Sequence, residues 1–473
     1  MNIIRDNMAP LMFGGMILFM LVGYPAAFSL AATGLFFGFI GIEFGLIRPE
    51  FLGNLTYQLF GIISNDLLLA IPFFTFMGAI LERCGLAEDL LDSIGQLFGS
   101  VRGGMSYAVI FVGAILGAIT GTVAASVIAM GVISMTPMLK YGYSTRHTMG
   151  VIAASGTITQ LIPPSLVLVV LADQLGRSVG DMYAGSIGPS LIQLALFCMW
   201  VGIVSIIWPN DVPALPLEAR TLHGWALWKK CLRGMIPSLG LIFLVLGTIF
   251  MGLATPSEAG AMGVVGAIAL AAFYGTLTWK LLYQGMSTTM RLTAMVVFIL
   301  IGARVFSLVF QGVGGKEWIE HLLTSLPGGQ LGFLIFVNIF IFVVAFFLDF
   351  FEIAFILIPL LAPAAEKLGI DLIWFGVLIC ANIQTSFMHP PFGFALFYLR
   401  GIAPRSIKTS DIYWGAVPWV GLQVILVVIL IFWPGSVTYW LGKGTGVDPS
   451  TIKIEIPQIE LPPLNFDEPP NPK

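Results

Sequence analysis

Charged side chains are scarce in this chain of 473 residues. Asp, Glu, Lys and Arg together make up 10% of it, whereas 58% of the residues are hydrophobic and the mean hydropathy is +0.95. Soluble domains average about 25% charged residues, so this composition excludes an ordinary soluble globular domain. We therefore expect an integral membrane protein that lies in a lipid bilayer.

Histidine, cysteine and nucleotide-binding motifs are also sparse. The four histidines are not paired at metal-ligand spacing, which argues against a membrane enzyme. The four cysteines are scattered without such spacing, and we interpret them as structural. The chain has no Gly-x-x-x-x-Gly-Lys-Ser/Thr motif, which a primary pump would need for its nucleotide. The net charge of −3 is too small to predict a nucleic-acid partner.

Long apolar runs recur along most of the chain. A helix needs about 20 apolar residues to cross the hydrocarbon core, whereas barrel strands would alternate in segments of about ten. The continuous runs therefore predict an all-α polytopic membrane protein. The predicted spans are 11–41, 64–81, 105–124, 146–162, 186–208, 235–254, 258–277, 290–311, 331–348, 372–388 and 412–433. The shorter apolar pieces predicted as hairpin halves are 123–139, 165–172, 353–365 and 392–399.

Two stretches carry the same unusual pattern. Residues 155–172, "SGTITQLIPPSLVLVVLA", and 382–399, "NIQTSFMHPPFGFALFYL", each run from small polar residues through Pro-Pro into an apolar segment. Aligning Pro163 with Pro390 fixes an offset of 227 residues. Further pairs that match at this offset are Lys140 with Lys367, Gly142 with Gly369, and Ser144 with Asp371. Ser144 and Asp371 are predicted to be helix N-caps. The chain is therefore expected to contain two structural repeats.

The Pro-Pro pairs predict broken helices. Proline disrupts the ladder of backbone hydrogen bonds, so the carbonyls upstream of each pair are expected to be free as ion ligands. Irregular backbone at membrane depth is tolerated where it lines a cavity, and paired interruptions in two halves point to a transporter's binding site. A proline pair that merely kinks a helix or ends it in a loop is the alternative, and two matched pairs weigh against it.

Several segments resemble, in the same order, motifs of the large membrane subunit of tripartite ATP-independent periplasmic (TRAP) transporters. The resemblance extends to about residue 435. The segments are "LVGYPAAFSLAATG", "LLLAIPFFTFMGAILERCGLAEDLLD", "GAITGTVAASVIAMG", "ASGTITQLIPPS", "GLATPSEAGAMGVVGA", "FFLDFFEIAFILIPLLAPAAEKLGID" and "NIQTSFMHPPFGFALF".

The resemblance implies two inverted repeats, each with a re-entrant hairpin and a broken helix, which form a mobile transport domain of the elevator type on a scaffold. It also implies sodium-driven import of small organic anions, carboxylates or sulfonates, through the bacterial inner membrane. The implied partners are a periplasmic substrate-binding protein and a small four-helix membrane subunit. No such bundle precedes the first span, so we expect that subunit to be a separate polypeptide.

On this basis the chain divides into alternating scaffold and transport segments. The scaffold helices and arm of the first repeat are 1–104, and its hairpin and broken helix are 105–185. The scaffold helices and arm of the second repeat are 186–341, and its hairpin and broken helix are 342–405. A final membrane helix, 406–437, is followed by an acidic, proline-rich tail, 438–473.

Hydroxyl, amide, carbonyl and carboxylate oxygens suit sodium, which is a hard cation. The candidate ligands at the hairpin tips and broken helices are Thr120, Gly121, Thr122, Ser155, Gly156, Thr157, Asp349, Asn382, Thr385 and Ser386. At the offset of 227, Thr122 falls on Asp349 and Ser155 on Asn382, so these four come first. Ser and Thr in membrane helices also bond back to their own helix. Asp349 is the strongest candidate, because an intramembrane carboxylate is expensive, although it could instead cap a helix.

An anionic substrate is expected between the two hairpin tips, where helix N-termini offer free N–H groups. The candidate contacts are Thr122, Ser126, Ser155, Asn382 and Arg304. Arg304 interrupts an apolar run and could pair with the substrate, snorkel, or pair within the scaffold. His389 stands where many members of the family have a small polar residue such as Thr, so it could tune substrate choice or simply pack. Glu258, in "TPSEAG", is predicted to start a helix.

Two other transport mechanisms have to be weighed. A channel would need a continuous polar pore and would not need paired broken helices. A stand-alone sodium-coupled carboxylate transporter of similar hairpin architecture shares most of the features above. A neighbouring gene for a secreted binding protein would discriminate between that carrier and a TRAP subunit.

Overall fold

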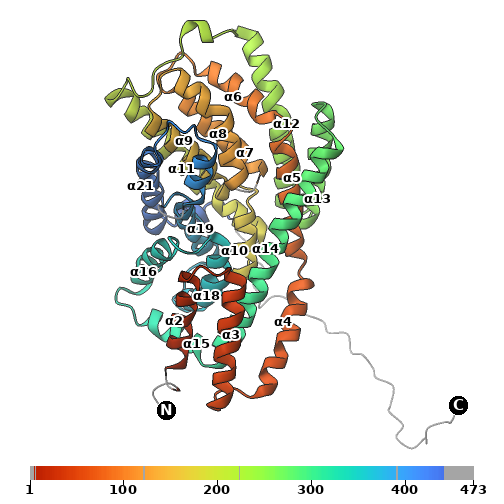
Figure 1. Ribbon diagram of the computed structural model, residues 1–473, viewed down its shortest axis with the longest axis vertical. Coiled ribbons are helices and arrows are strands. Elements are labelled where there is room, and N and C mark those ends of the chain that lie inside the picture. Colours follow the sequence, from red (N-terminus) through yellow and green to blue (C-terminus); the bar gives the residue numbers. More distant parts are fainter. Residues whose placement is uncertain (1–4, 6, 121–122, 223, 390–392, 442–473) are drawn as a thin grey trace, which may run out of the picture.

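The computed structural model describes residues 5, 7–120, 123–222, 224–389 and 393–441, which form helices joined by turns (Figure 1). Within these ranges there is no β-strand. Seven of the described helices are long and apolar enough to cross a membrane, and nine spans result if each of two bent pairs counts as one. The prediction of an all-α polytopic membrane protein is confirmed.

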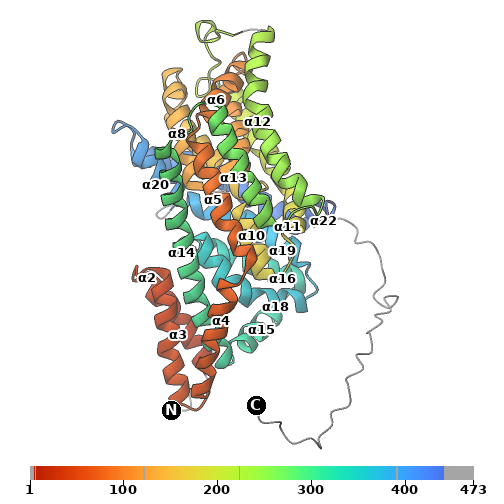
Figure 2. The ribbon, with the colours of Figure 1, turned by 90° about the vertical axis from the view of Figure 1, so that its right-hand side faces the viewer.

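The first predicted span is wrong. Residues 11–41 are not one helix but parts of two, α2 (Met8–Leu21) and α3 (Ala26–Glu43), which pack against each other (Figure 2). Gly23 adopts a left-handed φ of 88° between them, and Pro25 forms the N-cap of α3. Glycine tolerates this backbone geometry and proline cannot continue a helix, so the chain turns back here.

An elongated group of helices runs along one side of the molecule, and we call it the scaffold (Figure 1). Besides α3 it contains η1 (Pro49–Gly53), α4 (Asn54–Ile63), η2 (Asp66–Leu69), α5 (Ala70–Glu82), α12 (Gly224–Phe250), α13 (Pro256–Phe273) and α14 (Trp279–Gly312). The α4 and α5 segments form a bent pair with an angle of 48°. Helices α3 and α5 belong to the first repeat, and α13 and α14 are their counterparts in the second. Helix α3 packs on α14, and α13 packs on α5, so each of these contacts joins the two repeats.

The remaining helices apart from α2 form a second group, which we call the hairpin body. In the first repeat they are the arm α6 (Leu86–Leu97), the hairpin α7 (Gly104–Thr120) and α8 (Val123–Lys140), the broken helix α9 (Thr145–Thr157), η3 (Ile158–Gln160) and α10 (Leu166–Leu175), and α11 (Val179–Ile207). In the second they are the arm α15 (Gly315–Thr324), the hairpin α16 (Gly329–Val344), α17 (Phe350–Glu352), η5 (Ile353–Leu357) and α18 (Ile358–Lys367), the broken helix α19 (Leu372–Ile383), η6 (Gln384–Met388) and α20 (Phe394–Ile402), and α21 (Thr409–Phe432). Short η4 (Leu217–Ala219) and α22 (Gly435–Thr438) complete the helices. This grouping differs from the division made from the sequence, which placed both arms, most of α11 and most of α16 in scaffold segments.

The two repeats keep the register found in the sequence. Helices α9 and α19 begin at positions that differ by the predicted offset, as do α8 and α17. The turns before α9 and α19 use Gly142 and Gly369, with left-handed φ angles of 86° and 72°. The side chains of Ser144 and Asp371 accept hydrogen bonds from the backbone of the helices they begin, which confirms both predicted N-caps.

In the first repeat the Pro-Pro pair lies in a break of the helix and not at a kink. In the first repeat α9 ends at Thr157, a 3-10 turn follows, and the helix resumes only at Leu166. The intervening Pro163–Pro164 bond is cis. In the second repeat α19 and η6 end at Met388 and α20 follows, whereas Pro390–Pro391 lies outside the described residues.

Glycines allow the first hairpin to approach the broken helix closely. A Cβ atom on Gly113 would lie 2.7 Å from the Cβ of Ser155, and one on Gly117 would lie 2.6 Å from Cγ2 of Thr159. A Cβ atom on Gly156 would similarly collide with Val127 of α8. Small residues of this kind let membrane helices pack backbone against backbone. The hairpin and the broken helix therefore form one tightly packed unit.

Candidate functional site

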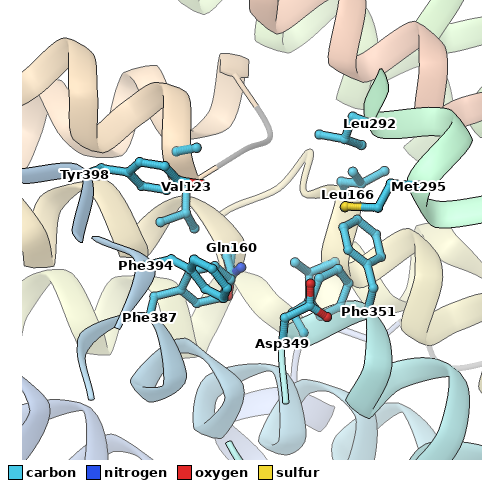
Figure 3. A pocket seen from close by; sticks show the side chains of 13 residues that line it. Val123, Gln160, Leu166, Leu292, Met295, Asp349, Phe351, Phe387, Phe394 and Tyr398 are labelled. Atoms are coloured by element: carbon cyan, nitrogen blue, oxygen red, sulfur yellow. The ribbon is translucent and has the colours of Figure 1, made fainter. Parts of the chain in front are cut away.

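A cavity of about 220 Å³ lies between the tips of the two hairpins (Figure 3). The residues around it are Val123, Ala124, Gln160, Leu166, Val167, Leu292, Met295, Asp349, Phe350, Phe351, Phe387, Phe394 and Tyr398. Four helices begin at its wall, namely α8, α10, α17 and α20. The first N–H groups of a helix lack intrahelical partners and carry the positive end of its dipole. One N–H of α10 and one of α17 are capped by Ser165 and Asp349, and the remaining N–H groups at these four helix starts can face an anion in the cavity.

The wall of the cavity is apolar and aromatic, with a few polar groups. Figure 3 shows the carboxyl group of Asp349 pointing into the space between Phe351 and the group that contains Phe387 and Tyr398. Gln160 reaches the same cavity from η3, and its buried Oε1 has no hydrogen-bond partner in the described part of the chain. A mostly apolar pocket with a small number of placed polar groups is typical of small-molecule sites.

Asp349 caps a helix, as the sequence allowed, and it also lines the cavity. Its Oδ1 accepts a hydrogen bond from the backbone N–H of Glu352 at 2.9 Å, and its own N–H donates to Oε2 of Glu352 at 3.0 Å. This capping box starts α17 and fixes the orientation of the side chain. Because the same residue lines the cavity, the cap also holds a carboxyl group at the tip of the second hairpin.

The candidates Ser155, Gly156 and Thr157 form the end of α9 and are buried, but they do not line the cavity. Ser155 Oγ donates to the carbonyl of Ile152 at 3.0 Å, and Thr157 Oγ1 donates to that of Ala154 at 3.0 Å. Both hydroxyls thus bond back to their own helix, as the alternative reading anticipated. A hydroxyl oxygen that donates its proton retains its lone pairs, so these oxygens can still accept or bind a cation.

The candidates of the second repeat lie at the end of α19 and in η6. Asn382 Nδ2 donates to the backbone oxygen of Asn338 in α16 at 2.8 Å and to its Oδ1 at 2.9 Å. Thr385 Oγ1 donates to the carbonyl of Asn382 at 2.7 Å, and Ser386 follows in the same turn. Asn382 borders a second, apolar cavity of about 380 Å³ between α16, α19 and α21. The structure therefore separates Asn382 from the cavity that contains Asp349.

The tip of the first hairpin is only partly described. Thr120 is the last residue of α7, and Gly121 and Thr122 lie outside the described residues. Ser126 is buried one turn into α8. Arg304 is half-buried in α14, nine residues beyond Met295, which is about 13 Å along a helix. The structure thus does not bring Arg304 to the cavity.

Two further residues adopt the structural roles that the sequence left open. Glu258 Oε2 accepts a hydrogen bond from the N–H of Thr255 at 2.7 Å in a capping box, so it starts α13 as predicted. The ring of His389 is buried between Phe342 and Phe346, with centroid separations of 4.3 Å and 4.4 Å. His389 therefore packs against aromatic rings and does not line the cavity.

Two carbonyls upstream of Pro163 already have partners, because Gln160 O accepts from Cys380 Sγ at 3.4 Å and Leu161 O accepts from Ser190 Oγ at 3.0 Å. Each carbonyl oxygen keeps a second lone pair, so its use as an ion ligand stays a prediction. Buried carbonyls released from a helix ladder need substitute donors, and neighbouring helices supply them here. The sequence did not show these partners, since they come from α11 and α19.

Sequence reasoning also missed two buried glutamines at the breaks. Gln193 Nε2 in α11 donates to Oε1 of Gln384 at 2.6 Å, and Gln423 Nε2 in α21 donates to Oγ1 of Thr157 at 3.2 Å. The available signal was a lone amide within apolar sequence, in "LIQLAL" for Gln193 and in "GLQVIL" for Gln423. A polar side chain inside a membrane helix is expensive and is a candidate for function by default.

Comparison with known proteins decides the family. Residues 13–436 match the family described as "Tripartite ATP-independent periplasmic transporter, DctM component". The chain belongs to this family. The TRAP resemblance predicted from the motifs is thereby confirmed. The family is described as a transporter component, and the relatives are named as permeases.

Several TRAP transporter permeases are similar to this chain over most of its length. The C4-dicarboxylate TRAP transporter large permease protein DctM of Pseudomonas aeruginosa is 29% identical over 404 residues, which cover 84% of this chain and 92% of the relative. The ectoine/5-hydroxyectoine permease UehC of Ruegeria pomeroyi is 28% identical, with 90% and 97% covered. The isethionate permease DctMQ of Oleidesulfovibrio alaskensis is 26% identical, with 92% and 66% covered.

A solved structure supports the fold of this TRAP subunit. The YdaH transporter of Alcanivorax borkumensis superposes with a TM-score of 0.56 at 17% sequence identity, covering 81% of this chain and 87% of that one. At this identity the similarity concerns the fold alone.

Proposed function

We propose that this TRAP large subunit is the carrier of a sodium-coupled importer of small organic anions, carboxylates or sulfonates, in the bacterial inner membrane. The observation that carries the proposal is the cavity between the hairpin tips, where four helices begin. Relatives are named for C4-dicarboxylate and isethionate, which both bear an anionic group. A volume of about 220 Å³ lies below the range of about 300–1,000 Å³ typical of drug-sized ligands, which favours a small substrate.

The position of Asp349 provides a physical reason for coupling to a cation. An anionic substrate in this cavity faces the Asp349 carboxylate as well as the helix N-termini. Like charges at short range in a dry site repel strongly, so a bound cation at the hairpin tip favours substrate binding. Sodium ligands are proposed at Asp349, Ser155, Thr157, Asn382 and Thr385, with Thr120, Gly121, Thr122, Gly156 and Ser386 as further candidates. Substrate binding would then require sodium, and sodium binding would be strengthened by substrate.

We further propose that the hairpin body moves past the scaffold in an elevator movement. The support is the packing, since the glycine contacts join the first hairpin and α9 into one unit while α3, α5, α13 and α14 pack among themselves. A rigid body that carries the cavity from one side of the membrane to the other alternates access without opening a continuous pore. This property also separates the proposal from a channel.

The proposed partners are a periplasmic substrate-binding protein and a small four-helix membrane subunit encoded separately. The family description, as one component of a tripartite periplasmic transporter, supports both. The binding protein would deliver the substrate, and the small subunit would complete the scaffold.

The decisive experiment is reconstitution in proteoliposomes. The cognate periplasmic binding protein is first screened by thermal shift against carboxylates and sulfonates, and the stabilising anion is then used in uptake assays. We expect uptake only with all three components and an inward sodium gradient, and none when choline replaces sodium. Uptake by the purified chain alone would favour the alternative considered from the sequence, a stand-alone sodium-coupled carboxylate transporter. Uptake that is independent of sodium would contradict the proposed coupling.

A further inference from the structure

Gln193 and Gln423 occupy the same position in the two repeats. Each is the fifteenth residue of the helix that follows a broken helix, since α11 begins at Val179 and α21 begins at Thr409. Both side chains are fully buried, with 0% exposure. The two residues are thus related by the internal symmetry of the fold.

Their hydrogen bonds cross from one repeat to the other. Gln193 of the first repeat donates to Gln384 at the break of the second, at 2.6 Å between Nε2 and Oε1. Gln423 of the second repeat donates to Thr157 at the break of the first, at 3.2 Å between Nε2 and Oγ1. Thr157 and Gln384 themselves coincide at the offset that aligns Pro163 with Pro390.

The two breaks also touch each other at this point. Thr157 Oγ1 lies 3.5 Å from Sδ of Met388 in η6, and Nε2 of Gln423 lies 3.8 Å from the same sulfur. Gln423 therefore contacts the end of α9 and the unwound turn after α19 together. A displacement of either break must disturb the other.

A purely space-filling role does not explain these amides. Oε1 of Gln193 and Oε1 of Gln423 have no hydrogen-bond partner in the described part of the chain. A buried polar atom without a partner destabilises the fold, and an apolar residue of the same size would avoid this penalty. What an apolar residue could not supply is the hydrogen bond that each glutamine Nε2 donates to a residue at a break.

We propose that Gln193 and Gln423 are positioning residues that brace each broken helix from the opposite repeat and thereby link the two sodium sites. The link to sodium rests on the function proposed above. The sodium candidates Ser155 and Asn382 each lie two residues before a braced residue, Thr157 or Gln384. Holding the braced side chain fixes the last turn of α9 or α19 and the orientation of the candidate ligand within it.

Hydrogen–deuterium exchange tests the brace without reference to sodium. In the assembled transporter, Gln193→Met removes the amide at nearly constant length, and we expect faster exchange at residues 382–389 of the other repeat. Gln423→Met is expected to speed exchange at residues 155–162. The matched control is Ser186→Ala in α11, which removes a buried hydrogen bond of 2.8 Å within its own helix and should change neither segment. If a Met variant does not fold, Gln193→Leu and Gln423→Leu replace it.

Equilibrium binding of radioactive sodium then tests the link to the ion sites. Each glutamine variant is expected to weaken sodium binding by about two- to tenfold, the equivalent of one net hydrogen bond. In a double-mutant cycle, Gln193→Met and Gln384→Met each remove the same hydrogen bond. The double variant should therefore lose less sodium affinity than the sum of the losses of the two single variants. Ser186→Ala should bind sodium as the wild type does.

The outcomes separate the two proposals. If the wild type binds no sodium, the proposed coupling fails, and exchange alone decides whether the brace exists. If exchange is unchanged, or rises only in the helix that carries the substitution, the cross-repeat brace is overturned. If the wild type binds sodium and both glutamine variants bind it equally well, the link between brace and ion sites is overturned.

Discussion

The side-chain Nδ2 of Asn65 donates a hydrogen bond to Oδ1 of Asp173 at 2.7 Å. Asn65 lies at the bend between α4 and α5 of the scaffold, and Asp173 lies in α10 of the hairpin body. The bond therefore joins the two groups of helices that an elevator movement must slide past each other. It is expected to stabilise the conformation seen here and to break during transport.

Tethering these two positions should stop transport. In a background without the native cysteines, Asn65→Cys combined with Asp173→Cys places two thiols where mercury(II) can bridge them. We expect bridging to abolish uptake and a reducing thiol to restore it, because the scaffold and the hairpin body can no longer separate. Uptake by the reconstituted complex before and after mercury measures this directly.

A matched pair within the hairpin body serves as the control. Arg177 pairs with Glu366 at 3.4 Å between the two repeats, both in segments assigned to the moving body. Joining Arg177→Cys to Glu366→Cys with a bis-maleimide long enough to replace the two side chains, with the cross-link verified by mass spectrometry, should leave uptake intact. If the link between positions 177 and 366 stopped uptake while the bridge between positions 65 and 173 did not, the elevator proposal would be contradicted.

Replacing Asp349 by asparagine should weaken sodium coupling without loss of the fold. Asparagine caps a helix about as well as aspartate does, so α17 should still begin at Phe350. The charge is lost, and we expect the sodium concentration for half-maximal uptake to rise about tenfold, equivalent to about 1.4 kcal/mol. Asp371→Asn is the control, because Asp371 caps α19 in the same way but does not line the cavity. An equal shift in both variants would indicate an effect of capping and not of charge at the cavity.

Removing the hydroxyl of Ser155 tests the candidate sodium site at the first break. Its hydrogen bond runs to Ile152 in its own helix, so Ser155→Ala should cost little stability. The sodium requirement for uptake should nevertheless rise, since one oxygen ligand is lost. Ser134→Ala is the matched control, because Ser134 is equally buried and bonds back to Met130 in α8. Identical sodium dependence in Ser155→Ala and the wild type would remove Ser155 from the site.

The close packing of the first hairpin predicts a large effect of a single methyl group. In Gly113→Ala, the new Cβ would lie 2.7 Å from Ser155 Cβ, so we expect a loss of about 1–3 kcal/mol and a lower melting temperature. Gly240→Ala in α12 is the control, because a Cβ atom there meets nothing within 4 Å. It should be neutral or stabilising by up to about 1 kcal/mol, as helix propensity favours alanine. Thermal unfolding of the detergent-solubilised complex compares the two.

The repeats could be predicted from sequence because they depend on local chemistry, whereas the family was predicted from the resemblance of its motifs. A proline pair interrupts a helix wherever it occurs, and a left-handed glycine followed by Ser144 or Asp371 starts a helix in either repeat. The capping box of Glu258 was predictable for the same reason. The error at 11–41 was also local, since Gly23 and Pro25 are turn signals within a run whose hydropathy concealed them.

The sequence by itself determined that this is a helical membrane protein with two broken-helix repeats and a carboxyl group at the tip of a hairpin. The tertiary structure alone decided which residues meet. It placed Asp349 and Gln160 in one cavity and Asn382 beside another, and kept Arg304 away from both. Periodicity and capping act over a few residues, whereas these contacts join segments up to hundreds of residues apart. Their partners are set by how the helices pack, which a single sequence does not encode in any local pattern.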